Sequence, residues 1–419
     1  MKNILDELKW RGLIYDIIDE ENLAKRLNKK ITVYCGFDPT ADSMHIGSLV
    51  PIISLLRFRK FGHRVIFIVG GGTGLVGDPS GKRVERSMNE KKIVDFWVER
   101  FKTQIRNFID PSDEDVLILN NYDWLGSLKA VDMWRDYGRH FPINYMLQKD
   151  AVKNRLENGL TYLEFSYMIM QSIDFLSVYK DKRYHCEMQI GGQDQWGNIT
   201  AGMELIRRTE GSDAEVFGLT LPLITKTDGT KFGKTESGAV WLDKNKTSPY
   251  IMYQFFINTP DSDVIKFLKY YTFLSEKEIL SLAESLEKEP HLRKAQKKLA
   301  EEVVRLCHGK EELDHAISLT ETLFSGDVKF LTIKDIEDVF KDSFAFETKE
   351  ELTLVDGLVA SGLASSKREA REFIVNKAIT VNGNLETEID FRIDKTKAIG
   401  GKYTIIRRGK KKYGIIKHK

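Results

Sequence analysis

The chain has 419 residues, of which 42% are hydrophobic and 30% are charged, and its formal net charge is +2. This balance excludes a disordered chain, which would hold fewer apolar residues, and a membrane-embedded one, which would carry apolar runs of about 20 residues. A chain of this length exceeds what one hydrophobic core supports, so two or three domains are expected.

The first 23 residues mix acidic side chains with apolar ones at helical spacing, such as Ile4, Leu8 and Leu13. This spacing predicts an amphipathic helix across residues 1–23. A secretory signal would need a basic start and an unbroken apolar run, and a transit peptide would avoid acidic residues, so neither fits. The expected location is therefore the cytoplasm, with no membrane association.

Between residues 31 and 242, short apolar runs alternate with long helical periods, which predicts βαβ units and a parallel sheet. The clearest strands are expected at residues 31–35, 64–69, 116–119 and 185–190. In open parallel sheets, ligands bind beyond the carboxyl ends of the strands. The residues that follow these strands are therefore the candidates for chemistry.

Residues 34–48 read Tyr-Cys-Gly-Phe-Asp-Pro-Thr-Ala-Asp-Ser-Met-His-Ile-Gly-Ser, a strand that ends in a polar turn and opens a helix. A helix start presents backbone N–H groups and a positive dipole end, so it favours an anion such as a phosphate. His45 and Gly47 lie at this start. A histidine in such a place is more often a capping or surface residue, but the whole string is far more specific.

Residues 70–83 again follow a strand and are rich in glycine. Within them, Gly72, Gly74 and Gly77 match G-x-G-x-x-G, so an NAD-dependent enzyme is a genuine alternative. A dinucleotide site needs its third glycine inside a helix, however, and the Asp-Pro-Ser-Gly sequence at 78–81 would break a helix at once. The continuation of the chain therefore argues against that alternative.

The stretch 161–175 predicts a strongly apolar helix with polar groups at chosen places. Tyr167, Gln171 and Asp174 lie at i, i+4 and i+7, so they share one helix face. Such groups are costly to bury without partners, so they should face water or bind something polar. A solvated stripe would explain this helix equally well if it stood alone.

Residues 185–198 repeat the order of strand, glycine turn and helix start. Asp194 is placed to cap that helix, and the glycines before it would let the backbone approach a ribose closely. Later, Lys231 and Lys234 lie three residues apart on a glycine-bearing loop and are placed to close over a polyphosphate. Lysines on a loop are usually solvated, and two near-matches to the phosphate-binding P-loop, at Lys82 and at Lys234, fail its spacing.

These five segments, in this order, resemble the bacterial tyrosyl-tRNA synthetases, which are class I aminoacyl-tRNA synthetases, and the similarity covers essentially the whole chain. His45 to Ser48 match the class signature His-Ile-Gly-His except that Ser48 replaces the second histidine, and residues 231–235 loosely match Lys-Met-Ser-Lys-Ser. The resemblance implies activation of L-tyrosine by ATP to tyrosyl-adenylate and pyrophosphate, then transfer of tyrosine to the 3′ end of tRNA(Tyr).

The resemblance also implies roles for single residues. The tyrosine-binding set is Tyr34, Asp78, Tyr167, Gln171, Asp174 and Gln195. The ATP-binding set is Gly36, Asp38, His45, Gly47, Ser48, Gly192, Asp194 and Lys234. The catalytic set, largely around the leaving pyrophosphate, is His45, Lys82, Arg86, Lys231, Lys234 and Thr235. ATP enters as the magnesium complex, and neither a tightly bound cofactor nor a protein-built metal site is expected.

Tryptophan activation is the nearest alternative, because that synthetase shares the fold. Tyr34 with Asp174 suits a phenol better than an indole. Two other classes stay open, an NAD-dependent oxidoreductase and a non-catalytic RNA-binding protein with a synthetase-like body.

The predicted architecture is α/β: a Rossmann-like parallel-sheet catalytic domain at 1–245, an α-helical anticodon-recognition domain at 246–323, a linker at 324–351, and a small α+β RNA-binding domain at 352–419. This last domain is of the kind shared with a ribosomal protein. The resemblance also implies a homodimer.

Basic residues concentrate at the end of the chain. From residue 355 onward there are 15 basic and 7 acidic residues, whereas the remainder has 49 basic and 55 acidic ones. This gradient favours a polyanionic partner, although a merely soluble basic tail explains the charge equally well. The candidate tRNA contacts are Lys367, Arg368, Arg371, Arg407, Arg408, Lys410, Lys411 and Lys412.

Overall fold

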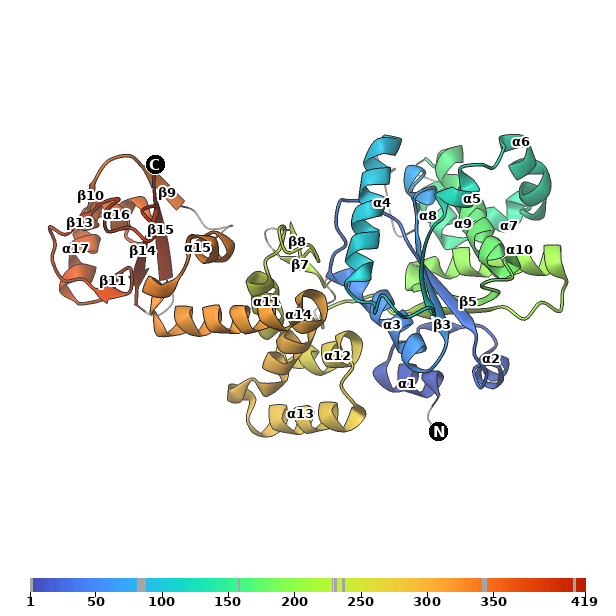
Figure 1. Cartoon of the computed structure of the whole chain (residues 1–419), viewed down its shortest axis with the longest axis horizontal. Helices are drawn as coiled ribbons and strands as arrows, with labels where there is room; N and C mark the ends of the chain where they lie inside the picture. The colour runs from blue at the N-terminus through green and yellow to red at the C-terminus, as the bar shows by residue number, and fades with distance from the viewer. Residues whose placement is uncertain are drawn as a thin grey trace. The chain divides into compact units, whose positions relative to one another are not determined.

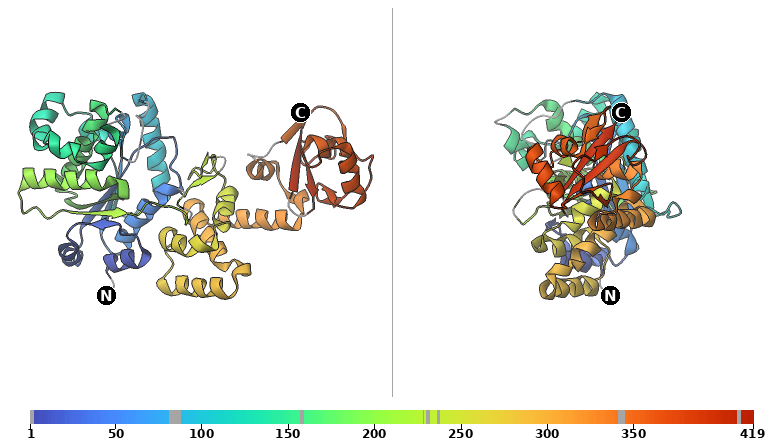
Figure 2. Two further views of the ribbon diagram at one scale, coloured as in Figure 1. Left: turned by 180° about the vertical axis from the view of Figure 1, so that it is seen from behind. Right: turned by 90° about the vertical axis from the view of Figure 1, so that its left-hand side faces the viewer.

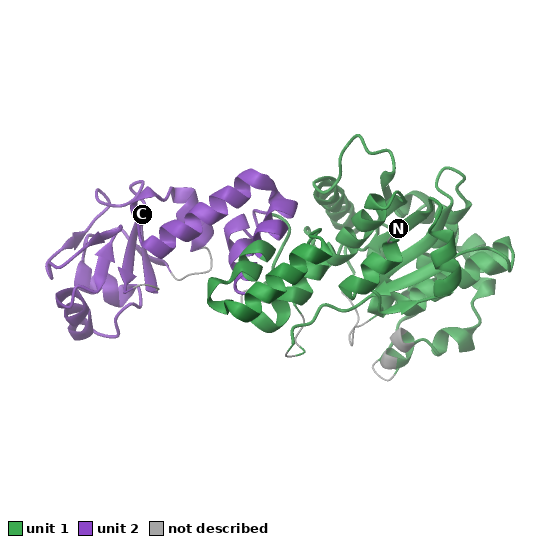
Figure 3. Cartoon of the chain, turned by 90° about the horizontal axis from the view of Figure 1, so that it is seen from below, with its two compact units in different colours: residues 1–243, 259–299 green, residues 244–258, 300–419 purple. Residues whose placement is uncertain are grey.

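The computed structural model describes residues 3–80, 88–156, 159–227, 229, 232–235, 238–340, 345–409 and 412–419. The chain forms two compact units (Figure 3). The first consists of residues 1–243 and 259–299, and the second of residues 244–258 and 300–419. In the described part of the chain, no helix is both long and apolar enough to cross a membrane.

The first unit is built on a six-stranded sheet of order β1-β6-β5-β2-β3-β4. Its strands are β1 (Asp16–Ile17), β2 (Thr32–Phe37), β3 (Arg64–Val69), β4 (Val116–Asn120), β5 (Cys186–Gly192) and β6 (Phe217–Leu221). All neighbours pair in parallel except β1, which runs antiparallel to β6. The four strands expected from the apolar runs are confirmed, and β1 and β6 are additional.

Helices cover both faces of this sheet, α3 and α4 on one and α9 and α10 on the other (Figure 1, Figure 2). They span α3 (Leu49–Lys60), α4 (Lys91–Arg106), α9 (Tyr162–Lys180) and α10 (Trp196–Glu210). A parallel sheet covered on both faces needs apolar strands throughout, and five of the six residues of β3 are buried. Thr161 caps α9 by accepting a hydrogen bond from the Glu164 N–H, so this long apolar helix begins where the sequence predicts.

The prediction of one helix across residues 1–23 is wrong. The structure has α1 (Ile4–Arg11) and α2 (Glu20–Arg26), with β1 between them. Gly12 ends α1 in the left-handed conformation, with φ of 71°, and its N–H bonds to the Leu8 carbonyl. Glycine adopts this conformation at little cost, so it terminates the helix despite the continuing apolar pattern.

Shorter elements complete the first unit. They are η1 (Ile46–Ser48), η2 (Thr73–Leu75), α5 (Tyr122–Leu125), α6 (Ala130–Asp132), η3 (Met133–Tyr137), η4 (Gly138–His140), α7 (Ile143–Leu147), α8 (Asp150–Leu156), η5 (Gln193–Gln195), the hairpin β7 (Lys234–Thr235) and β8 (Gly238–Ala239), α12 (Asp261–Tyr271), α13 (Glu276–Lys288) and η6 (Pro290–Leu292). Only the 3₁₀ turn η2 follows β3 before residue 80, so the helix that a dinucleotide site would need there is absent from these described residues.

The second unit contains a mixed sheet of order β12-β11-β14-β15-β9. Its strands are β9 (Ala345–Thr348), β11 (Ile379–Val381), β12 (Asn384–Leu385), β14 (Tyr403–Arg408) and β15 (Lys412–His418), and β10 (Leu352–Thr353) pairs separately with β13 (Arg392–Ile393). Its helices are α11 (Pro249–Ile257), η7 (Val328–Phe330), α15 (Ile333–Val339), α16 (Leu354–Ala360) and α17 (Lys367–Val375). Helix α14 (Lys294–Ser325) spans both units and is interrupted at Gly309.

The predicted fold class is confirmed: an α/β catalytic sheet, a helical region and a carboxyl-terminal α+β part. The bounds of the three domains and of the linker stay predictions. Within the segment 324–351, which we expected to be a linker, the structure has α15 and β9, and β9 pairs with β15.

Candidate active site

The tyrosine-binding and ATP-binding candidates gather at one edge of the catalytic sheet. Strands β5, β2, β3 and β4 are parallel neighbours, so their carboxyl ends lie along the same edge. Residues 38–48 follow β2, residues 70–80 follow β3, residues 121–125 follow β4 and residues 193–198 follow β5. Four stretches that are far apart in the sequence therefore meet.

Tyr34 is the most enclosed of these candidates. It lies on β2 with 1% of its surface exposed, and its ring packs at 5.2 Å from that of Phe175. Its hydroxyl is buried and has no hydrogen-bond partner. Buried polar groups are nearly always paired, so this hydroxyl marks a place where a polar ligand fits.

Asp174 lies on α9 and is 4% exposed. Trp124 Nε1 donates to its Oδ1 at 2.8 Å, and Asn121 Nδ2 donates to its Oδ2 at 2.9 Å. Burial nevertheless raises the pKa of this carboxyl to about 8, because it outweighs these two donors. Burial, and then the nearby Asp174, raise the pKa of Tyr34 well above its ordinary value, so Tyr34 is a hydroxyl donor at neutral pH.

Two further buried oxygens without partners belong to the same region. They are Oε1 of Gln171, on α9, and Oε1 of Gln189, which lies on β5 directly beside Tyr34. Amide oxygens only accept hydrogen bonds. Together with the hydroxyl of Tyr34, they offer both acceptors and a donor to a small polar molecule.

A second carboxylate is fixed across the sheet edge. Asp38 accepts hydrogen bonds from Tyr167 Oη at 2.7 Å and from Thr73 Oγ1 at 2.6 Å. Asn121 Nδ2 in turn donates to Thr73 Oγ1 at 2.8 Å. Because Asn121 also bonds Asp174, one network of hydrogen bonds joins both carboxylates and holds Tyr167 in place.

Asp78 and Gln195 form the next pair along the edge. Gln195 Nε2 donates to Asp78 Oδ2 at 2.6 Å, and the Ser80 N–H donates to Asp78 Oδ1 at 2.8 Å. Asn198 Nδ2 donates to Gln195 Oε1 at 3.1 Å, which fixes the amide orientation. The predicted cap by Asp194 is wrong, because the N-cap residue of α10 is Gln195, which makes no side-chain cap bond.

His45 begins η1 as its N-cap residue, so the capping role that we weighed from the sequence is real. Its Nδ1 accepts a hydrogen bond from the Gly47 N–H at 3.0 Å. The neutral ring therefore carries its proton on Nε2, where it can donate to an anion at the helix start. Ser48, which stands at the second signature histidine, is half-buried and precedes α3 without a side-chain cap bond.

The hairpin that carries Lys234 and Thr235 in β7 lies beside this histidine signature. The Ile46 N–H donates to the Val240 carbonyl at 2.9 Å, and the Val240 N–H donates to the Gly233 carbonyl at 3.1 Å. Gly233 has φ of 106°, and a Cβ there would lie 3.2 Å from Ile46 Cγ1. The two signatures are thus adjacent through the backbone. Lys82, Arg86 and Lys231 lie outside the described residues.

Two of the three glycines predicted to bind ATP lie at or next to the end of a strand. Gly36 lies in β2 beside open space, since a Cβ there would meet nothing within 4 Å. At the end of β5, a Cβ on Gly192 would lie only 2.7 Å from Asp194 Oδ1. A side chain at Gly192 would therefore require the Asp194 carboxylate to move, whereas a side chain at Gly36 would displace nothing.

Four residues of the site were missed from the sequence: Thr73, Asn121, Trp124 and Gln189. Asn121 follows the carboxyl end of β4, so the rule that drew attention to the other strand ends would have pointed to it. No pattern singles out Trp124, whose role depends on a short helix that turns its indole toward Asp174.

Some of the candidate tRNA contacts are paired with other groups of the protein, and others are exposed. Lys367 pairs with Asp356 at 2.7 Å, and Arg408 Nη1 donates to the Leu363 carbonyl at 2.6 Å. Arg407 Nη1 donates weakly to the Ser325 carbonyl at 3.5 Å. Arg368, Arg371 and Lys412 are exposed, and Lys410 and Lys411 lie outside the described residues.

Two family models match the chain. Residues 25–325 match the model described as "tRNA synthetases class I (W and Y)". Residues 335–416 match the model described as "Tyrosine--tRNA ligase SYY-like C-terminal domain".

Curated relatives match over the full length. The chain is 54% identical to tyrosine–tRNA ligase 1 of Bacillus subtilis, covering 100% of both chains. It is 52% identical to the tyrosine–tRNA ligase of Geobacillus stearothermophilus, covering 99% of this chain and 100% of the other.

The chain is also similar to solved structures. A C-terminally truncated mitochondrial tyrosyl-tRNA synthetase of Aspergillus nidulans aligns with a TM-score of 0.69 and 32% identity, covering 77% of this chain and 95% of that chain. A tryptophanyl-tRNA synthetase of Encephalitozoon cuniculi shares the fold at 13% identity and a TM-score of 0.54. The full-length matches exclude the oxidoreductase alternative and select tyrosine over tryptophan. The chain therefore belongs to the bacterial tyrosyl-tRNA synthetases, within the class I aminoacyl-tRNA synthetases.

Proposed function

We propose that the enclosed site between β2 and α9 is where this tyrosine–tRNA ligase binds the phenol of L-tyrosine. The observation that carries the proposal is the buried Tyr34 hydroxyl without a partner, close enough to Asp174 for that carboxylate to raise the pKa of Tyr34. A substrate hydroxyl between them would accept from Tyr34 and donate to Asp174. Phenylalanine would leave the Tyr34 hydroxyl without a partner and would give Asp174 no donor beyond Trp124 and Asn121. Tyrosyl-tRNA synthetases are themselves the standard example of selection by this means.

The amino and carboxyl groups of the substrate would lie toward the sheet edge. Gln171 Oε1 is a buried acceptor suited to an ammonium group, and Tyr167 and Asp78 are held in fixed positions near it. Asp38 and Gln195 would orient the reacting carboxylate. Their hydrogen-bonded partners keep these side chains in position before the substrate arrives, which reduces the cost of binding.

ATP would bind over the starts of η1 and α10. The His45 Nε2–H, the first N–H groups of the helices and the cations of the Lys234 hairpin would face the phosphates. The tyrosine carboxylate, which is already a nucleophile at neutral pH, then attacks the α-phosphate in line and releases pyrophosphate. No general base is needed, so the site contributes positioning and electrostatic stabilisation.

Magnesium would enter bound to ATP as part of the substrate. Among the described residues, no group of three or more His, Cys, Asp or Glu side chains is arranged to hold a metal ion. We expect this ion to be held mainly by phosphate oxygens, as magnesium commonly is.

The second unit would bind tRNA(Tyr) through its basic surface. Helix α17 carries the exposed Arg368 and Arg371, and β15 begins at the exposed Lys412. We propose that these residues contact phosphates, with anticodon recognition by the helical region at 246–323. The cytoplasm is the proposed location.

A homodimer is the proposed assembly. Six of the exposed large apolar side chains fall in one stretch of 32 residues in the first unit: Val131, Trp134, Ile143, Leu147, Leu156 and Tyr162. Apolar residues gathered in this way mark a contact surface more often than chance exposure does. The proposed occupant is the same stretch of a second copy, because a two-fold axis brings identical surfaces together.

Tyrosine-dependent exchange between ATP and labelled pyrophosphate tests the proposed chemistry. Exchange that requires tyrosine and is not supported by phenylalanine is expected. Absence of exchange from a chain that still binds tRNA(Tyr) would favour a non-catalytic RNA-binding protein instead.

A further inference from the structure

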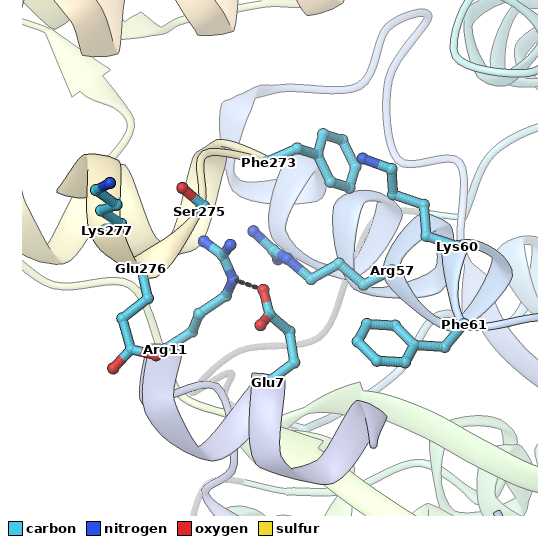
Figure 4. A pocket seen from close by; sticks show the side chains of 9 residues that line it. All are labelled: Glu7, Arg11, Arg57, Lys60, Phe61, Phe273, Ser275, Glu276 and Lys277. Atoms are coloured by element: carbon cyan, nitrogen blue, oxygen red, sulfur yellow. Dashed lines mark hydrogen bonds and ion pairs between the residues drawn. The ribbon is translucent and has the colours of Figure 1, made fainter. Parts of the chain in front are cut away.

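The first unit has a pocket of about 400 Å³ that the proposed function does not use (Figure 4). It is lined from α1 by Glu7 and Arg11, and from α3 by Arg57 and Lys60, with Phe61 beyond the helix end. Residues 273 and 275, between α12 and α13, and residues 276–277, at the start of α13, complete it. Its volume falls within the range of small-molecule sites.

This pocket is remote from the tyrosine and ATP site. His45 precedes the first turn of α3, whereas Arg57 and Lys60 lie in its last turn, and a helix of 12 residues is about 18 Å long. The chain then enters β3 at Arg64, so the pocket lies near the amino ends of the strands. The proposed catalytic edge is at their carboxyl ends.

Two buried guanidinium groups meet in the pocket wall, side by side in Figure 4. Arg11 is fully engaged: its Nε donates to Glu7 at 2.6 Å, its Nη1 to the Lys269 carbonyl at 3.0 Å and its Nη2 to the Leu274 carbonyl at 2.6 Å. It thus satisfies carbonyls at and beyond the end of α12 and has its own counter-ion.

Arg57 differs, although it is equally buried, with 2% of its surface exposed. Its Nη2 donates to the carbonyls of Lys269, Tyr270 and Thr272, at 3.1, 3.2 and 2.7 Å. Its Nε and Nη1 have no hydrogen-bond partner. The contacts with the end of α12 therefore satisfy only Nη2, and Nε and Nη1 are buried without an acceptor.

The charge of Arg57 is only partly compensated, by the nearby Glu7. No carboxylate of the described residues forms an ion pair with it, and Glu7 is bonded to Arg11. Burial, and then the charge of Arg11, lower the pKa of Arg57. A buried cation without a partner costs several kcal/mol, so an anion beside it would be strongly favoured.

The rest of the lining adds positive charge and flat apolar walls. Arg11, Arg57, Lys60 and Lys277 outnumber Glu7 and Glu276. Lys60 Nζ lies 4.4 Å from the ring centre of Phe273, and the Arg57 guanidinium lies 5.5 Å from it. Phe61 stands half-exposed at the rim.

We propose that this pocket binds an oxyanion of the phosphate class, with Arg57 as its principal donor and Lys60 as a second cation. Arginine forms charge-assisted hydrogen bonds with phosphate oxygens, and the Nε–H and Nη1–H groups of Arg57, which point to different sides of the guanidinium, can each donate one. The anion is either inorganic phosphate or a phosphate carried on a small aromatic body that packs against Phe273 and Phe61. Occupation would tie α1, α3 and the segment after α12 together.

The test is a titration by isothermal calorimetry of the full chain, saturated with tyrosine and ATP analogue to fill the proposed catalytic site. Sodium phosphate and phenyl phosphate are the two probes, with sodium chloride at equal ionic strength as the blank. Saturable binding of phosphate is expected. Tighter binding of phenyl phosphate would identify an organic phosphate, and equal or weaker binding would identify the inorganic ion.

Arg57→Met should weaken phosphate binding at least about tenfold, because a charged donor pair is lost. Arg59→Met is the matched control, because Arg59 lies in the same helix but donates to Asp113 at 2.7 Å and does not line the pocket. It should bind phosphate as the unmodified chain does. Equal binding by Arg57→Met and the unmodified chain, or a response no larger than that to chloride, would overturn the proposal.

Lys60→Ala provides a second variant that does not disturb the buried arginines. It should retain the thermal midpoint and weaken phosphate binding about threefold, the scale of a partly exposed ion pair. If Arg57→Met does not fold, Lys60→Ala alone tests the proposal. A phosphate affinity of Lys60→Ala equal to that of the unmodified chain would then reject the site.

Discussion

Trp124 Nε1 donates a 2.8 Å hydrogen bond to Oδ1 of Asp174, and it does so from a short helix after β4, 50 residues before Asp174 in the sequence. The carboxylate that we assign to the substrate phenol is therefore oriented by residues that the substrate need not touch. Asn121 holds the other oxygen of the same carboxylate. Both contacts leave the carboxylate in one fixed plane.

Replacement of Asp174 should reduce the preference for tyrosine over phenylalanine. In Asp174→Ala the phenol loses its buried acceptor, and a buried group left without a partner costs about 1–3 kcal/mol, or about 5–150-fold in the ratio of kcat/KM values. Pyrophosphate exchange with each amino acid measures that ratio. A preserved ratio would show that the phenol binds elsewhere.

Stability should depend on pH through Asp174. Its pKa is about 8 in the folded chain, whereas an aspartate in an unfolded chain ionises near pH 4. Between these values the folded state binds more protons, so this group's contribution to the free energy of unfolding falls as pH rises from about 4 to about 8.

The comparison of the unmodified chain with Asp174→Asn isolates this effect from other titrating groups. Urea denaturation at several pH values gives the free energy of unfolding of each chain. The value for the unmodified chain minus the value for Asp174→Asn should fall as pH rises to about 8 and then level off. A difference that does not vary with pH would contradict the raised pKa.

His45→Ala and Lys234→Ala should slow formation of tyrosyl-adenylate more than they weaken tyrosine binding. Each would remove a donor that we assign to the charge developing on the phosphates, and one such donor contributes about 3 kcal/mol, or about 100-fold in rate. Rapid-quench measurement of the first turnover gives this rate, and equilibrium dialysis gives tyrosine affinity.

Lys226→Ala is a suitable control for these two variants, because Lys226 precedes the hairpin and lies outside the signature. It should form the adenylate at the normal rate. Normal rates in all three variants would remove His45 and Lys234 from the assigned machinery.

Deletion of residues 352–419 should abolish tRNA charging and spare adenylate formation. Substitution is gentler, because β15 in this segment pairs with β9. Arg368→Ala and Arg371→Ala should each weaken tRNA binding and reduce the slope of log affinity against log salt by about one. Filter binding at several salt concentrations measures both quantities.

Lys395→Ala, at an exposed position of the same unit, is the matched control for these arginine variants. It should leave tRNA affinity and the salt slope unchanged. If the arginine variants behaved like this control, α17 would not be the tRNA-binding surface.

Ile143→Glu should convert a dimer into a monomer. The side chain is one of the six exposed apolar ones in the stretch 131–162, and burying a carboxylate against a second copy would be strongly unfavourable. Sedimentation equilibrium gives the mass. Leu280→Glu changes an equally exposed residue of α13 and should leave the mass unchanged. Equal masses for the two variants would reject the proposed interface.

Sequence patterns located the scaffold of the site well, for a physical reason. A buried parallel strand is an unbroken apolar run and a helix face has a fixed period, so β2, β3 and the shared face of Tyr167, Gln171 and Asp174 could be predicted. Tyr167 and Asp174 are indeed buried. The roles assigned to these residues as ligands stay predictions, because no contact with a substrate tests them.

What escaped prediction depends on contacts across the fold. Trp124 comes from a four-residue helix with no periodicity of its own, and only the packing of that helix beside α9 makes its indole a partner of Asp174. Gly12 ended the first helix because local backbone freedom outweighed an apolar pattern that continued past it. The partner of a polar side chain is set by tertiary structure, which a single sequence does not display.

The strand pairing around Val240 has a practical consequence for exchanging parts among related enzymes. Backbone hydrogen bonds join residue 44 to residue 242 and residue 46 to residue 240. A further one joins residue 240 to residue 233. The loop that carries Lys234 is thus joined by a backbone hydrogen bond to the segment that follows it. A chimaera that exchanges the loop alone would break these hydrogen bonds. The junction should therefore lie after residue 242, so that the transplanted piece keeps its own hydrogen bond between residues 233 and 240.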